Sequence, residues 1–169
     1  MTGEIGCLTK LVSGIAPEGE PHPRAARSFE REDEKGASVS EDELTALLSA
    51  ARVAPSADNS QIWRFVTVRD PYLRRRLGEA AGERLSESFS RAEVVIVACA
   101  ARFIVSRSRR EQPFAMIDVP IAVLHLLLQA EEMGLPCSWK LSVDEQAVRS
   151  VLGVPGDVRV VAMLALGAR

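Results

Sequence analysis

Residues 54–66 read APSADNSQIWRFV, a polar turn that runs into an apolar and aromatic segment. Pro55 ends the helix predicted before it, because proline lacks a backbone N–H and clashes with the preceding helical turn. Ser56 and Asn59 are residue types that hydrogen-bond their own backbone in tight turns. Residues 63–68 then form a predicted strand. The stretch predicts a helix–turn–strand unit whose turn carries polar side chains, among them the neutral Ser56, Asn59 and Gln61.

A helix is predicted on the N-terminal side of this turn, beginning at Ser40. Ser40 and Glu43 form the pattern of a capping box, in which the hydroxyl accepts from a backbone amide and the glutamate reaches back to another. Apolar residues recur at helical spacing on one face, at Leu44, Leu47, Leu48 and Ala51. Another short helix is predicted over residues 1–16, and the highly charged residues 30–36 are expected to form an exposed loop.

Beyond the turn, helical and strand patterns alternate. They predict a helix after Pro71, a buried strand at 94–100, a long helix at 114–133 closed by Gly134, a short helix at 144–152 and a last buried strand at 158–166. The long helix is apolar nearly all round, which predicts a place at the centre of the fold or of an interface. A long helix between strands indicates an α+β fold with a helix-covered sheet rather than a β-sandwich.

Composition bounds the class of protein and its setting. The 169 residues suit one domain, and 47% hydrophobic with 26% charged residues is typical of a globular chain. The net charge of −2 offers no basic surface for nucleic acid, so the arginines within 74–76 and 107–110 are interpreted as solvated. No apolar stretch has the length of a membrane span. Three widely spaced cysteines favour a reduced, cytoplasmic setting, with Cys99 in the core.

Standard catalytic and metal-binding motifs are absent from the sequence. No glycine-rich phosphate loop follows a predicted strand, and no serine nucleophile elbow is present. The two histidines, His22 and His125, are isolated, so a zinc site is not expected and His125 is interpreted as a core residue. No catalytic side chain is therefore assigned.

The turn resembles the signature loop of the nitroreductase family, Pro-Ser-x-x-Asn-x-Gln-Pro-Trp, which lies between that family's first long helix and first strand. Supporting pieces occur in the family's order, at residues 24–29, 94–100, 118–130, 134–139 and 161–167. The resemblance implies a nitroreductase-like three-layer α-β-α sandwich with a central, mostly antiparallel sheet. It places the long central helix at a homodimer interface, and it divides the chain into an N-terminal extension at 1–22 and an FMN-binding domain at 23–169.

The resemblance implies FMN as the cofactor. Its phosphate is expected to contact Arg24 and Arg27, because planar guanidinium groups bond two oxygens at once. The alternative from the residues alone is that both are surface arginines of a loop. The ribityl chain and ring edge are expected to meet the turn of the other subunit, through Pro55, Ser56, Ala57, Asn59 and Gln61. The alternative for these residues is that they only cap the chain after the proline.

The reacting end of the flavin is expected beside Trp139, Lys140, Leu141 and Ser142. In the family, backbone amides at the last two of these positions approach flavin N5, and such rigid donors need no reorganisation during hydride transfer. The family usually has Gly-Gly where this chain has Leu141 and Ser142, a change that affects the depth or orientation of the ring. In other departures from the family pattern, Pro23 stands where the family has its first N-terminal arginine, Ala25 where it has serine, and Ile62 where proline is usual.

Three functions stay open at this point. The first is an FMN-dependent oxidoreductase that takes hydride from NAD(P)H and passes it to a nitroaromatic or a quinone, for which the cofactor supplies the chemistry. The second is a degenerate relative that binds flavin or another planar ligand without turnover, as the missing phosphate ligand and Gly-Gly suggest. The third is a non-catalytic dimeric interaction module that keeps only the scaffold.

Overall fold

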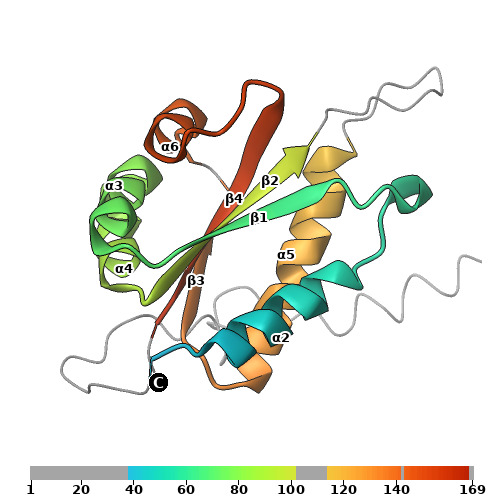
Figure 1. The fold of residues 1–169 in the computed structure, drawn as a ribbon, viewed down its shortest axis with the longest axis horizontal. Coiled ribbons are helices and arrows are strands. Elements are labelled where there is room, and N and C mark those ends of the chain that lie inside the picture. Colours follow the sequence, from blue (N-terminus) through green and yellow to red (C-terminus); the bar gives the residue numbers. More distant parts are fainter. Residues whose placement is uncertain (1–37, 102–113, 142, 168–169) are drawn as a thin grey trace, which may run out of the picture.

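The computed structural model describes residues 38–101, 114–141 and 143–167, without the side chains of 83–85. Four strands form one antiparallel sheet in the order β1-β2-β4-β3. They are β1 (Trp63–Val68), β2 (Val94–Ala101), β3 (Cys137–Lys140) and β4 (Val158–Leu166). The helices α2 (Glu41–Arg52) and α5 (Ala115–Glu132) cover one face, and α3 (Pro71–Ala81), α4 (Glu83–Arg91) and α6 (Glu145–Leu152) cover the other (Figure 1). The predicted α+β sandwich of three layers, with its antiparallel sheet, is confirmed.

The central strand β2 is buried on both faces. Ile96 and Ala98 belong to the core shared with α2 and α5, whereas Val95 and Val97 belong to the core shared with α3, α4 and α6. Successive side chains of a strand point to opposite faces, so a strand covered on both sides must be apolar at every position. This explains the continuous apolar run from which the strand was predicted.

The ends of α2 and of the next helix follow the predicted signals. The Glu43 amide donates to Ser40 Oγ at 3.2 Å and the Ser40 amide donates to Glu43 Oε2 at 2.8 Å, which is a complete capping box. Asp70 caps α3 through Leu73, and Pro71 occupies the first helical turn, where its missing N–H costs nothing. Gly134, with φ +69°, follows α5 in the left-handed conformation that ends many helices.

Two elements were not predicted from the sequence, α4 and β3. In α4, Phe89 is the one side chain that packs fully into the core among those described. The four residues of β3 become a strand by pairing with the far end of β4, Cys137 opposite Leu166. The predicted helix at 1–16, the loop at 30–36 and the domain boundary after residue 22 lie outside the described residues.

The helix α5 is buried on one side and apolar on the other. Val119, Val123 and Leu126 pack into the core under the sheet. Large apolar side chains remain exposed on this helix, Ile117, Leu124 and Leu128 on the opposite side and Met116 in the first turn. His125 is partly buried, so its interpretation as a core residue was wrong. None of the helices in the described part of the chain has both the length and the apolarity that crossing a bilayer requires.

An ion pair joins α6 to β4. The Nε of Arg159 donates to both carboxylate oxygens of Glu145, at 2.8 and 2.9 Å, and the Val160 amide donates to one of them at 3.1 Å. Desolvation disfavours this carboxylate, but the hydrogen bonds from Arg159 and Val160 and the charges of Arg159 and Arg149 outweigh it and lower the pKa of Glu145.

Two thiols in the described part of the chain are free, of which Cys99 is buried and Cys137 is partly buried. Cys99 is buried in β2 as predicted, and burial, helped by the charge of Glu145, raises its pKa to about 11. Burial alone raises the pKa of Cys137 to about 12. Both thiols therefore stay protonated near neutral pH, which makes them poor nucleophiles.

Candidate functional site

The polar turn between α2 and β1 is closed by its own side chains. The Gln61 backbone amide donates to Ser56 Oγ at 3.0 Å, and the Gln61 side-chain amide donates to Asn59 Oδ1 at 3.0 Å. Between Ser56 and Ser60, the short 3-10 helix η1 (Ala57–Asn59) forms a single helical turn. These bonds fix the relative positions of three polar side chains that the sequence had assigned to a ligand.

The backbone of this turn is left-handed at three non-glycine residues. Asp58, Asn59 and Gln61 have φ of 51°, 53° and 45°. Aspartate and asparagine tolerate this region better than most residues, but each such residue still costs on the order of 1 kcal/mol. Strain of this kind persists where the surroundings hold it, and it is concentrated at binding and catalytic sites. The conformation of this turn is therefore imposed by its surroundings in the fold.

A buried carboxylate ties the turn to α5. Asp118, in the first turn of α5, is 3% exposed, and its Oδ2 accepts a hydrogen bond from the Ala57 amide at 3.1 Å. Figure 1 shows η1 beside the N-terminal end of α5, beyond the edge of the sheet. Asp118 was not predicted to be a site residue, although a carboxylate within the apolar part of a long helix was an available signal.

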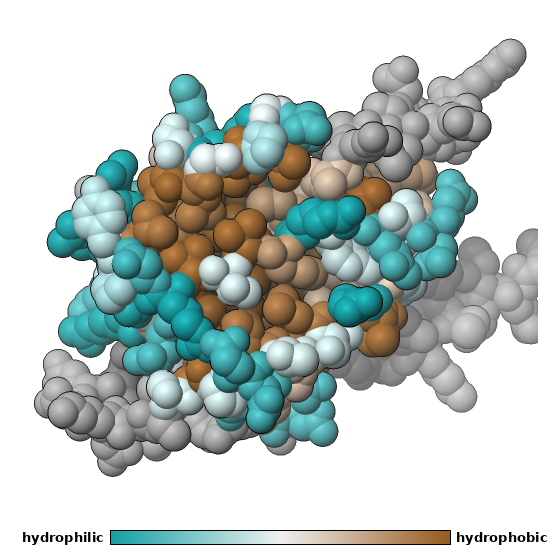
Figure 2. Space-filling view, viewed as in Figure 1, coloured by the Kyte–Doolittle hydropathy of each residue, from teal (hydrophilic) through white to brown (hydrophobic). Residues whose placement is uncertain are grey.

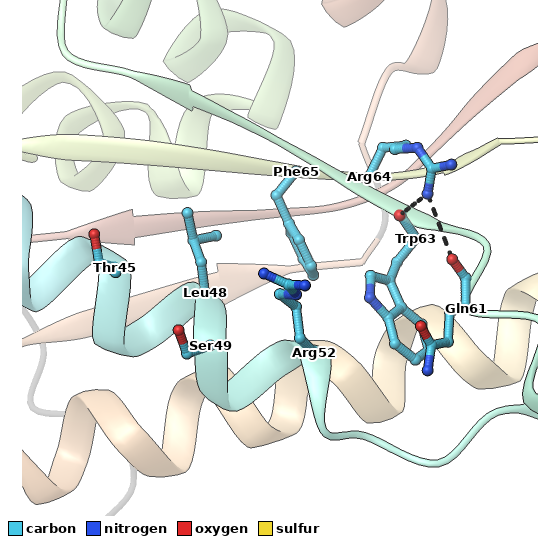
Figure 3. Close-up of a pocket in the computed structure, with 8 residues that line it drawn as sticks. All are labelled: Thr45, Leu48, Ser49, Arg52, Gln61, Trp63, Arg64 and Phe65. Carbon is cyan, nitrogen blue, oxygen red and sulfur yellow. Dashed lines mark hydrogen bonds between the residues drawn. The ribbon is translucent and has the colours of Figure 1, made fainter.

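A pocket of about 460 Å³ opens beside the turn, between α2 and β1 (Figure 3). Arg64 is held at its rim, since its NH1 donates to the carbonyl oxygens of Trp63 at 2.7 Å and Gln61 at 3.4 Å. Arg52 extends from α2 toward Phe65. The pocket is lined by Thr45, Leu48, Ser49, Arg52, Gln61, Trp63, Arg64 and Phe65. Apart from Gln61, these residues were not predicted to form a site, because a helix and a strand bring them together.

The second predicted segment lies at the opposite edge of the sheet. β1 and β3 are separated by two strands. Across the sheet, Trp63 lies level with Arg159 of β4, whereas Lys140 pairs with Met163, four residues further along that strand. Three strand spacings and four residues along the strands put Trp63, which follows the turn, roughly 20 Å from Lys140 within one subunit. Trp139 and Leu141 are 40% and 48% exposed there. The structure thus brings Pro55, Ser56, Ala57, Asn59 and Gln61 together, but not with Trp139, Lys140 and Leu141.

The remaining predicted ligand residues, Arg24, Arg27 and Ser142, lie outside the described residues, as do Pro23, Ala25 and the arginines within 107–110. Within the described ranges, no group of three histidine, cysteine, aspartate or glutamate side chains is arranged to hold a metal ion.

Comparison with known proteins identifies several similar chains. A model of the nitroreductase family matches residues 34–88 and 83–168. An NADH dehydrogenase of Thermus thermophilus is 31% identical over 157 residues, which cover 76% of this chain and 77% of that protein. The crystal structure of a nitroreductase family protein from Clostridium novyi NT has a TM-score of 0.72 at 27% identity and covers 79% of this chain and 77% of that one. An FMN-dependent nitroreductase from Clostridium difficile has a TM-score of 0.64 at 24% identity, covering 79% of each chain.

Proposed function

Since the chain belongs to the nitroreductase family and is an NAD(P)H-dependent oxidoreductase, we propose that it uses FMN to pass hydride to a small aromatic acceptor such as a nitroaromatic or a quinone. The turn at residues 56–61 is the observation that carries the proposal. Three of its side chains, Ser56, Asn59 and Gln61, are neutral and partly or fully exposed, and hydrogen bonds among these residues fix their positions.

The donors and acceptors of this turn fit the polar groups of a flavin. Ser56 Oγ accepts from the Gln61 amide, so its hydroxyl proton can be donated outward. Asn59 uses its oxygen within the turn and keeps its NH₂ as a donor, while Gln61 keeps its side-chain carbonyl as an acceptor. This set matches the carbonyl and N–H groups of the isoalloxazine edge and the hydroxyls of the ribityl chain. These three side chains carry no charge that would have to be desolvated on binding, and the charged Asp58 beside them is exposed.

The other assigned residues act at the two ends of the cofactor. Bound FMN would supply the redox chemistry, accepting hydride at N5 from the nicotinamide and releasing it to the acceptor. Arg24 and Arg27 are proposed to hold the phosphate, and the backbone amides of Leu141 and Ser142 to face the reacting end of the ring. Trp139 and Lys140 complete that wall. These residues bind and orient, and none of them has to move a proton.

We further propose that the active form is a homodimer. Within one subunit the start of β1, which follows the turn, and the end of β3 lie roughly 20 Å apart at opposite sheet edges, too far for both segments to contact one ring system. A composite site, with the turn of one subunit facing the β3 end of its partner, removes this difficulty. The exposed apolar side of α5 provides surface for such a contact. Figure 2 shows a further gathering of hydrophobic residues over the middle of one face, rimmed by polar residues.

The setting proposed for the enzyme is cytoplasmic. It rests on the three widely spaced cysteines of the sequence, which suit a reducing compartment.

One observation favours a second candidate, a flavin-binding protein without turnover. Leu141 is 48% exposed at the position where a glycine would allow close approach to the ring. A side chain here can hold the ring too far from the nicotinamide for hydride transfer. This candidate predicts a yellow protein that does not oxidise NADH or NADPH.

The test is the absorption spectrum of the purified protein, followed by FMN titration and steady-state oxidation of NADH and NADPH. We expect a flavin spectrum, a melting temperature that rises with FMN concentration, and oxidation of the nicotinamide once an acceptor is added. Arg27→Ala and Asn59→Ala should each weaken FMN binding. Arg75→Ala, an exposed arginine in the opposite helical layer, is the control and should not.

A colourless protein whose melting temperature is indifferent to FMN would refute the flavin proposal and leave only the scaffold. A yellow protein without nicotinamide oxidation would select the second candidate. Wild-type affinity in both Arg27→Ala and Asn59→Ala would show that the assigned site is wrong even if flavin binds elsewhere.

A further inference from the structure

We propose that Asp118 is a positioning residue for the flavin site, holding the turn at residues 56–61 against the start of α5. The inference rests on the proposed function, since it takes that turn to be a flavin-contacting segment. Asp118 does not itself belong to the polar set that faces a ligand. It acts through the Ala57 amide, to which it is hydrogen-bonded at 3.1 Å.

The burial of Asp118 requires an explanation. Among the residues that the structure describes, Asp118 is the only charged or polar residue in the buried core, with 3% of its surface exposed, and the rest of that core is apolar. Burying a carboxylate is costly unless it is hydrogen-bonded and electrostatically favoured. The Ala57 amide supplies a hydrogen bond, and the N-terminal end of α5 supplies a favourable dipole. An apolar residue would fill the same space without that cost. What the carboxylate adds at this position is the hydrogen bond to the Ala57 amide.

The turn needs an external support at its N-terminal half. Its internal bonds, between Ser56, Asn59 and Gln61, set its shape but not its place on the protein. At its C-terminal end, Arg64 binds the Gln61 carbonyl from three residues away. At η1, the bond from Ala57 to Asp118 joins residues 61 positions apart in the chain. It ties the three left-handed residues to a helix that is rigidly packed in the core.

The anchor also connects the turn to the proposed subunit contact. Asp118 directly follows Met116 and Ile117, which are about half exposed in the first turn of α5. A turn fixed to this helix keeps a constant position relative to whatever α5 contacts. In a composite site, that fixes the turn relative to the flavin of the partner subunit.

The test compares three variants of the full-length protein. Asp118→Ala removes the acceptor, Asp118→Asn keeps a carbonyl oxygen that can accept from Ala57, and Val123→Ala is a control that loosens the same helix at a fully buried position without touching the turn. The readouts are the FMN dissociation constant, kcat and KM for NADH, and hydrogen exchange at residues 57–61 in the flavin-free protein.

Asp118→Ala should raise the FMN dissociation constant by about tenfold or more, the usual effect of losing a hydrogen bond to a charged group. It should also speed exchange of the Ala57 amide. Asp118→Asn should restore both quantities to near wild type. Val123→Ala should lower the melting temperature and leave FMN affinity and turn exchange unchanged.

Wild-type FMN affinity in Asp118→Ala would overturn the positioning role, and so would equal losses in Asp118→Asn and Asp118→Ala. If Asp118→Ala does not fold, Ala57→Pro removes the same hydrogen bond from the donor side, in a position preceded by an extended Ser56. It must then weaken FMN binding, or the inference fails. A wild-type protein that binds no FMN refutes the proposed function, and exchange at Ala57 still shows separately whether the anchor exists.

Discussion

The exposed apolar side of α5 makes a quantitative prediction about self-association. Leu124 and Leu128 lie one helical turn apart on that side, 49% and 61% exposed. If α5 forms the subunit contact, replacing both with glutamate removes apolar contact area and places charges in the interface. We therefore expect the double variant Leu124→Glu/Leu128→Glu to be a folded monomer, because neither side chain belongs to the buried core.

The magnitude follows from the exposed fractions. Together the two side chains offer about one whole leucine per subunit for burial on association. Complete burial of a leucine is worth about 1.5–3 kcal/mol, so the two subunits of a symmetric dimer lose about 3–6 kcal/mol. This corresponds to a dissociation constant raised by roughly a hundredfold to ten-thousandfold. Burial of four glutamates in the contact would add to the effect.

Sedimentation equilibrium over a wide concentration range measures this constant directly. Tyr72→Glu is the matched control, since Tyr72 is 55% exposed on α3 in the opposite helical layer and should leave association unchanged. FMN affinity should fall together with dimer stability in the double variant, because the proposed site is composite. A double variant that dimerises as tightly as wild type would refute the assignment of α5 to the interface.

Three further predictions concern the fold. Ser40→Ala removes the hydroxyl that caps α2 and should lower the free energy of unfolding by about 1 kcal/mol in urea denaturation. In a Cys7→Ser background, Cys99 and Cys137 should resist Ellman's reagent at pH 8, well below their raised pKa values of about 11 and about 12, and react once the protein is unfolded; rapid native reaction would contradict this. The pKa of Glu145 is lowered by its arginine and amide partners, which outweigh desolvation. Its contribution to the stability of the fold is therefore complete above the pKa that it has in the unfolded chain, and is lost as the pH falls through the lower pKa that it has in the folded protein. The stability difference between wild type and Glu145→Gln should therefore shrink on acidification below about pH 4.5, as pH-dependent urea denaturation will show.

Local signals explain which elements could be predicted. The capping box at Ser40, the proline at 71 and the left-handed glycine at 134 each act within a few residues, so the ends of α2, α3 and α5 follow from the sequence. In contrast, β3 has only four residues, too short a run to predict a strand, and its strand conformation is imposed by pairing with β4. The nine residues of α4 include only two apolar ones, Leu85 and Phe89, and so short a pattern did not lead to a helix prediction.

The candidate site divides in the same way. The polar residues of the turn were found because they are contiguous in sequence and resemble a family signature. The anchor at Asp118 depends on a contact between residues far apart in the chain. The pocket beside Arg52 and Arg64 depends on how α2 lies against β1, and a single sequence reports neither arrangement. Which sheet edge carries each half of the site follows from the strand order alone, and no local pattern encodes that order.

The placement of β1 and β3 at opposite sheet edges has a genetic consequence for the proposed enzyme. Each flavin would draw on the turn of one polypeptide and the β3 end of the other, so damage to either half is not confined to the subunit that carries it. Two inactive alleles, one changed at Asn59 and the other at Trp139, would complement when co-expressed, because every mixed pair rebuilds one undamaged centre from their unaltered halves.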